Sequence, residues 1–110
     1  MQLVISRSPL ATKKWRVSTP PGTKPARHVD FGQRGASDYT VHKDKERMAR
    51  YVARHGGVGS GGRSTKENWG ASGLWTAGFW SRWLLWSRPS LAGARSLLRS
   101  RFGIRLVSAK

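Results

Sequence analysis

The sequence predicts a mainly α protein, a small domain of two or three helices around a tryptophan core with extended basic arms. Three observations support this fold class. Five of the six tryptophans lie between Trp69 and Trp86, and each can bury a large apolar area. Three stretches have helical spacing or capping residues. Both ends of the chain are basic and contain no acid. With 110 residues, the chain is one domain at most.

Residues 1–28 are predicted to form a basic, proline-rich extended arm. This segment is poor in apolar residues and holds four of the five prolines: Pro9, Pro20, Pro21 and Pro25. Proline removes a backbone donor and disfavours regular structure, so an arm fits better than a folded element. Residues 2–5 (QLVI) have strand character. We expect at most one short strand pair, between residues 2–5 and residues 104–107.

The first helix is predicted to begin near Thr40 or Asp44 and to end at His55. Asp44 is a suitable N-cap, and Glu46 in the first turn complements the helix dipole. Glycine follows His55 at once and ends the helix. The apolar stripe consists of Val41, Met48 and Val52, with Tyr51 beside it. One helix of this length needs a partner in water, and the tryptophan-rich stretch is the obvious one.

Residues 29–103 are predicted to be the helical domain, interrupted by a glycine-rich loop at 56–63. Residues 57–64 (GVGSGGRS) differ at one position from a P-loop, with Arg63 where that motif has lysine. A P-loop joins a strand to a helix in a parallel sheet, whereas a predicted helix precedes this stretch. We therefore interpret it as a flexible linker.

The second helix is predicted from Thr76 to Ser87, and the third from Ser90 to Phe102. The second is apolar nearly all round, which favours a buried position. Pro89 separates the two helices, Ser90 is the expected N-cap of the third, and Gly103 is its expected terminator. Residues 104–110 are predicted to be a basic tail.

The charge distribution indicates a polyanionic partner. The formal net charge is +16, with 21 lysines and arginines against five acids. All five acids lie between Asp30 and Glu67, so both ends are purely cationic. Fourteen of the 21 basic residues are arginine, which favours bidentate phosphate contacts. RNA and DNA fit this pattern equally well.

We predict that the phosphate backbone is contacted by basic residues of the helices, in a largely sequence-independent way. These residues are Lys43, Arg47, Arg50, Arg54, Arg82, Arg95, Arg99 and Arg101. Most of the tryptophans are expected to form the core. Five in so short a stretch exceed what one small core usually holds, so Trp69 and Trp80 are predicted to stack on bases or to contact a partner.

An enzyme is the least favoured class. The three histidines lack converging ligands for a metal, and no nucleophile has a neighbouring base, so we expect no catalytic residues, no metal and no cofactor. The absence of cysteine excludes disulfides and leaves the compartment open. An intracellular or virion location fits a nucleic-acid partner.

Two alternatives to nucleic-acid binding remain at this point. The chain could be a minor scaffold subunit that threads between larger, acidic protein subunits. It could also be a peripheral membrane protein that uses Trp80, Trp83 and Trp86, with arginines at headgroup level. The sequence favours a structural, polyanion-binding component of a larger nucleoprotein or virion assembly over both.

Two long blocks of the sequence resemble a family of small basic proteins encoded by nucleocytoplasmic large DNA viruses, the giant viruses of algae and amoebae. The family pattern is FG-x-x-G-x-SDYT-x-HKD, then ENW, then TAGFWSRWLLW. Here it is matched by Phe31 to Asp44, by Glu67 to Trp69 and by Thr76 to Trp86. The resemblance supplies no activity. It implies that the SDYT-x-HKD and GFWSRWLLW blocks belong to one folded unit.

Overall fold

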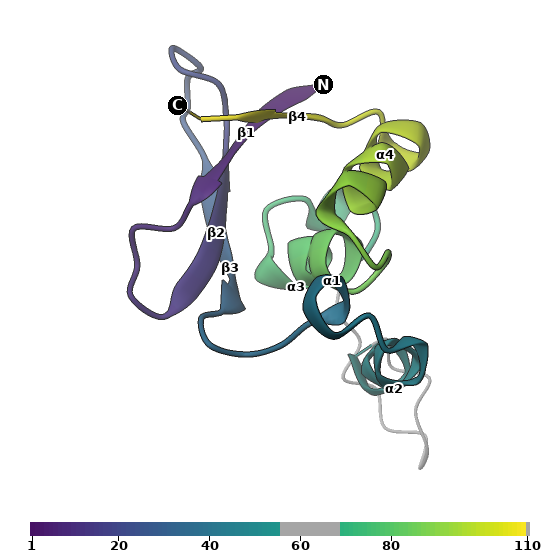
Figure 1. Ribbon diagram of the computed structural model, residues 1–110. Coiled ribbons are helices and arrows are strands. Elements are labelled where there is room, and N and C mark those ends of the chain that lie inside the picture. Colours follow the sequence, from purple (N-terminus) through teal and green to yellow (C-terminus); the bar gives the residue numbers. More distant parts are fainter. Residues whose placement is uncertain (56–68, 110) are drawn as a thin grey trace.

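The computed structural model describes residues 1–55 and 69–109, which form a sheet covered on one face by helices (Figure 1). The strands are β1 (Gln2–Arg7), β2 (Lys13–Ser18), β3 (His28–Gln33) and β4 (Arg105–Ser108). Their order in the sheet is β3-β2-β1-β4. The β1–β2 and β2–β3 pairs are antiparallel, and the β1–β4 pair is parallel. The hydrophobic core lies between the sheet and the helices.

The prediction of a mainly α fold is wrong, because the described residues contain 23% strand in a four-stranded mixed sheet beside 41% helix. The prediction of extended arms fails with it. Residues 1–28 contain two complete strands, and the tail contains a third. The predicted strand pair is present, since residues 2–5 lie opposite residues 105–108. It forms one edge of a larger sheet.

A row of apolar side chains across the strands explains why the basic N-terminal segment folds. Ile5 lies opposite Val17, and Val17 lies opposite Val29. All three are buried, together with Leu3 and Phe31 of the same strands. Successive strand residues point to opposite faces, so these residues give the sheet an apolar face toward the helices.

Three of the four prolines of the predicted arm, Pro20, Pro21 and Pro25, lie in the connection between β2 and β3, and Pro9 lies between β1 and β2. Thr19 and Arg27 close this connection: the Thr19 N–H donates to the Arg27 carbonyl (2.9 Å) and the Arg27 N–H donates to the Thr19 hydroxyl (3.1 Å). Proline is compatible with a turn because it needs no ladder hydrogen bond there. The prolines therefore mark a turn between paired strands.

An ion pair joins β2 to the edge strand β3. Arg16 lies opposite Asp30 in the register, with its Nε 2.9 Å from Oδ1 of Asp30. The hydrogen bonds from Arg16 lower the pKa of the Asp30 carboxyl below 3.8. Partial burial of the carboxyl raises the pKa, and the hydrogen bond from the Ser8 hydroxyl lowers it again, so that the net change is downward. The stability that this pair contributes is present above pH 3.8 and is lost as the pH falls through the lowered pKa. Asp30→Asn should therefore flatten the acid limb of the stability curve.

Thermal unfolding between about pH 2 and pH 5 checks this expectation. Glu46→Gln is the matched control, since it removes one exposed carboxylate from a helix surface. That variant should keep the acid limb of the parent. An Asp30→Asn protein whose melting temperature still falls with acid as steeply as the parent's would contradict the role given to this pair.

Two helices follow the sheet hairpins, where one was predicted. They are α1 (Tyr39–His42) and α2 (Lys45–His55). Lys43 separates them because it adopts a left-handed conformation with φ of 56°. Asp44 caps α2 as predicted, accepting from the N–H groups of Glu46 (3.0 Å) and Arg47 (3.3 Å). The predicted glycine-rich loop at 56–63, with its P-loop-like stretch, lies outside the described residues.

The tryptophan-rich segment forms a short 3₁₀ turn, η2 (Ala71–Gly73), then α3 (Ala77–Trp80), the π-helical η3 (Ser81–Leu85) and α4 (Leu91–Phe102). The predicted helix from Thr76 to Ser87 is thus α3 continued by η3. Its N-cap is Thr76, whose hydroxyl accepts from the Phe79 N–H. The predicted third helix is confirmed as α4, with Ser90 as N-cap and Gly103 after it at φ of 66°.

The predicted tryptophan core is present in part. Trp80 and Trp83 are buried, with Phe79 between α3 and the sheet. Trp75 and Trp86 lie only partly buried at its edge. The core also contains residues of the sheet, such as Leu3, Val17 and Phe31, which lie in segments that were not predicted to form it.

Candidate polyanion-binding groove

A basic groove lies between α4 and β4. Its volume is about 210 Å³, and its lining contains no acid. The lining residues are Arg95, Ser96, Arg99, Ile104, Arg105 and Leu106. Three of these six residues are arginine, so the groove concentrates positive charge over an apolar floor. We call it the α4–β4 groove.

Local structure explains how three arginines come together. Arg95 and Arg99 are four residues apart on α4 and therefore share one face of the helix. Gly103, in the left-handed conformation, ends α4 and lets the chain turn into β4. Arg105 is the first residue of β4, next to that turn. Like charges at this spacing repel one another, so an anion would stabilise the arrangement.

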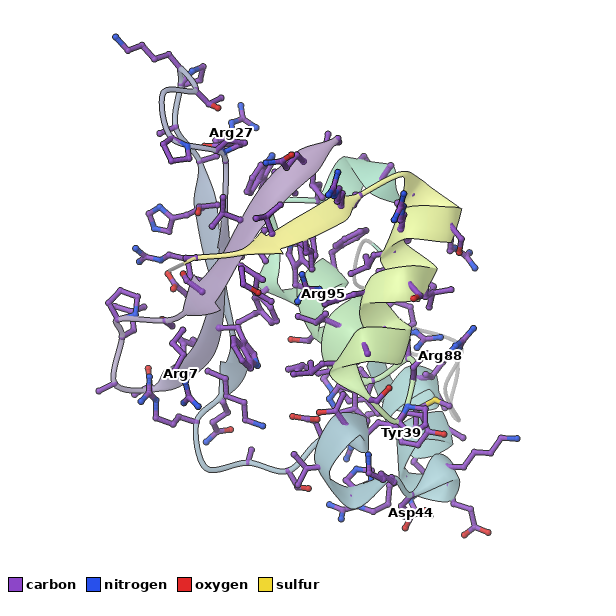
Figure 2. All side chains as sticks on the ribbon, turned by 45° about the horizontal axis from the view of Figure 1, so that its top comes forward. Arg7, Arg27, Tyr39, Asp44, Arg88 and Arg95 are labelled. Carbon is purple, nitrogen blue, oxygen red and sulfur yellow. The ribbon has the colours of Figure 1, made fainter. Side chains whose placement is uncertain are left out.

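One of the three arginines is held inside the protein, and two are left available. Arg95 lies on the side of α4 toward the sheet (Figure 2), where it donates to the Leu106 carbonyl (2.5 Å) and the Ser108 hydroxyl (3.5 Å). Arg99 and Arg105 are exposed. In the described part of the chain, no ion pair or side-chain hydrogen bond involves either of them.

Arg82 and Arg101 meet elsewhere, around Trp83. Their guanidinium carbons lie 4.5 Å and 4.6 Å from the centroid of its ring. Arg82 is half-buried and donates to the Trp86 carbonyl (2.7 Å). Burial lowers the pKa of the Arg82 guanidinium, and the charges of Arg101 and Arg88 lower it further, while Tyr51 acts in the opposite sense. Arg82 is therefore tied into the packing, whereas Arg101 is exposed.

The predicted contacts on α1 and α2 form a separate group. Lys43 donates to the Pro89 carbonyl and so holds the start of α4. Arg47, Arg50 and Arg54 are exposed on α2, which lies at the far end of the helical layer from the α4–β4 groove (Figure 1). The eight predicted basic residues thus occupy three places. The structure brings only Arg95 and Arg99 into the groove.

The two predicted partner contacts, Trp69 and Trp80, have different surroundings. Trp80 is 0% exposed and donates its indole N–H to the Leu74 carbonyl (2.6 Å). Contrary to the prediction, its ring belongs to the core. Trp69 is partly exposed, and the Arg82 guanidinium lies 5.4 Å from its ring. A partner contact at Trp69 stays a prediction.

Arg105 was not among the basic residues predicted to contact phosphate. The residue precedes a short apolar run in the tail, and one sequence does not show where that tail lies. The strand character of residues 104–107 was the available signal, because β4 runs beside β1 and follows α4 directly.

The features suggested for membrane contact are largely internal. Trp80 and Trp83 are buried, and Trp86 is partly buried against Tyr51. Among the described residues, no helix has the length and apolar character needed to cross a bilayer. The same residues contain no group of three or more histidines and acids that could hold a metal ion.

Comparison with known proteins gives one match. The family described as "Family of unknown function (DUF5754)" matches residues 3–55, which run from β1 to the end of α2. No curated protein and no solved structure matches the chain. The matched region ends before the α4–β4 groove and supplies no activity. The resemblance to the viral family stays a prediction, although its two blocks do meet, with the ring centroids of His42 and Trp86 5.3 Å apart.

Proposed function

We propose that the protein is a non-enzymatic structural protein that binds the phosphate backbone of RNA or DNA, within a larger nucleoprotein or virion assembly. The observation that carries the proposal is the α4–β4 groove, where Arg99 and Arg105 are exposed beside Arg95 and their side chains have no partner among residues 1–55 and 69–109. The formal net charge of +16 supports it by drawing a polyanion to the whole surface.

The proposed binding is independent of base sequence. Arginine side chains in an open groove contact phosphates, which position a nucleic acid without reading it. The large aromatic rings that could stack on bases are mostly in the core, as with Trp80 and Trp83. Arg95 acts as a support, because its bonds to the Leu106 carbonyl and the Ser108 hydroxyl fix the wall of the groove.

A salt titration of binding tests the proposal. The parent and an Arg99→Gln/Arg105→Gln variant are titrated with a short RNA and a matched DNA duplex, and fluorescence anisotropy reports binding. Each phosphate neutralised on duplex DNA contributes about 0.9 to the slope of log affinity against log salt. The double variant should therefore lose about two units of slope.

Arg47→Gln/Arg50→Gln is the matched control, since it removes the same charge from α2. We expect a smaller change of slope for it, and circular dichroism should show both variants folded. An equal loss from the two variants would contradict the α4–β4 groove as the main contact. If the affinity of the parent for both nucleic acids at physiological salt is no higher than its affinity for polyglutamate, the nucleic-acid proposal is wrong. A scaffold role then takes its place.

A further inference from the structure

A second hollow lies where β2 begins and β3 ends, at the other end of the strands from the α4–β4 groove. Its volume is about 270 Å³. We call it the β2–η3 hollow. It is lined by Lys13, Lys14, Gly32, Gln33, Ala36, Ser37, Asp38, Tyr51, Ala77, Ser81, Leu85 and Trp86. These residues come from the sheet, from the loop before α1, and from the helical layer.

One wall of the β2–η3 hollow is a stack of aromatic rings. The rings of Tyr51 and Trp86 are parallel within 1°, with centroids 4.4 Å apart. His55 continues the stack beyond Tyr51 (4.2 Å), and His42 lies against Trp86 (5.3 Å). Such contacts hold the rings in place and cover both faces of Tyr51 and one face of Trp86, so this wall is preorganised and presents ring edges to the hollow. Leu85 adds an apolar surface beside it.

The floor is fixed by a close approach of sheet and helix. Gly32 adopts φ of 77°, and a Cβ at this position would come within 2.9 Å of the Leu85 side chain. Only glycine allows β3 to lie this near η3. The close contact between Gly32 of β3 and Leu85 of η3 therefore forms one boundary of the hollow.

The charges in the β2–η3 hollow are unequal. Lys14 and Asp38 neutralise each other, with Nζ 2.6 Å from Oδ2. Lys13 is partly buried at the start of β2 and lines the same hollow. Over residues 1–55 and 69–109, the Lys13 ammonium makes no ion pair or hydrogen bond, and the hydroxyls of Ser37 and Ser81 make no hydrogen bond. One uncompensated cation and two hydroxyls thus remain for a ligand.

We propose that the β2–η3 hollow binds a small organic anion with a flat apolar body. The anionic group pairs with Lys13 and accepts from the hydroxyls, and the flat part lies against Tyr51, Trp86 and Leu85. Small-molecule sites have this character: mostly apolar walls, a few polar groups, and a volume of about 300 Å³ or more. A nucleic-acid backbone does not fit it, because the site offers a single free cation. The inference is independent of the proposed function.

The indole N–H resonance of Trp86 tests the site directly. In a ¹⁵N–¹H spectrum each tryptophan gives one indole signal, and a Trp86→Phe variant identifies the one from Trp86. Phenyl phosphate is the probe, with inorganic phosphate and phenol as its two halves. We expect phenyl phosphate to shift the Trp86 signal and to saturate at about millimolar concentration, and each half to shift it far less.

Lys13→Gln should weaken this binding at least tenfold, by analogy with the loss of a charge-assisted hydrogen bond (order of magnitude). Lys24→Gln is the control, since that exposed lysine lies in the turn between β2 and β3 at the opposite end of those strands. Three results would overturn the proposal: a Trp86 signal that does not move, equal binding by Lys13→Gln and the parent, or an equal response to inorganic phosphate. Loss of RNA binding without loss of phenyl phosphate binding separates this site from the groove.

Discussion

Trp80→Ala is expected to lower the free energy of unfolding by about 3–5 kcal/mol, the range typical of a large aromatic side chain removed from a core. Trp80 has no exposed surface. Its ring lies 6.1 Å from Phe31 of β3 and 5.2 Å from Phe79 of α3. It therefore joins the sheet to the helical layer. Its indole N–H also closes the segment before α3 through the Leu74 carbonyl. Removal leaves a cavity at this junction and an unpaired carbonyl.

Urea unfolding followed by circular dichroism measures this loss. Trp75→Ala is the control, because Trp75 belongs to the same segment but packs only partly against the core. Trp80→Phe should lie between the parent and Trp80→Ala, since it keeps most of the ring and loses the N–H donor. It also provides a folded variant if Trp80→Ala is unfolded in buffer. Equal losses at Trp75 and Trp80 would contradict the central position given to Trp80.

The helices were predictable because their signals are local. Asp44, Ser90 and Gly103 are capping residues next to the segments that they begin or end. Such signals need no knowledge of the rest of the fold. The break at Lys43 was not predictable, because lysine has no preference for the left-handed conformation that it adopts there.

The sheet was missed because its evidence is distributed over the chain. β2 has the sequence KKWRVS, in which only Val17 is fully buried. Its apolar row is complete only when Ile5 and Val29 lie on either side. The β1–β4 pair was predictable because both segments have strand character, but its place at the edge of a larger sheet depends on β2 and β3.

The candidate site was predictable in part for the same reason. The spacing of Arg95 and Arg99 places them on one helix face from sequence alone. The contribution of Arg105 depends on where β4 lies, which is a consequence of the sheet. The misassignment of Trp80 has a related cause, because the sequence shows how many tryptophans there are but not which ones the sheet covers.

Asp38→Ala is expected to cost about 3–5 kcal/mol, as is typical when one partner of a buried ion pair is removed. The Asp38 side chain is 4% exposed, and that of its partner Lys14 is 18% exposed. Asp38 also caps α1, accepting from the Thr40 N–H (3.0 Å). The substitution therefore leaves the Lys14 ammonium without its counter-charge and the first turn of α1 without its acceptor. Both losses fall where the loop after β3 enters the helical layer.

Asp44→Ala is the matched control for Asp38→Ala. Asp44 is an exposed N-cap on α2 with no buried partner, and loss of such a cap typically costs about 1 kcal/mol. A Lys14→Met/Asp38→Ala double variant should recover part of the stability, because it no longer leaves a partly buried charge unpaired. Urea unfolding of the parent, of the single variants Lys14→Met, Asp38→Ala and Asp44→Ala, and of the double variant measures these differences. If Asp38→Ala costs no more than Asp44→Ala, or if the double variant is less stable than the sum of its single changes, the ion pair does not join β2 to α1 as described.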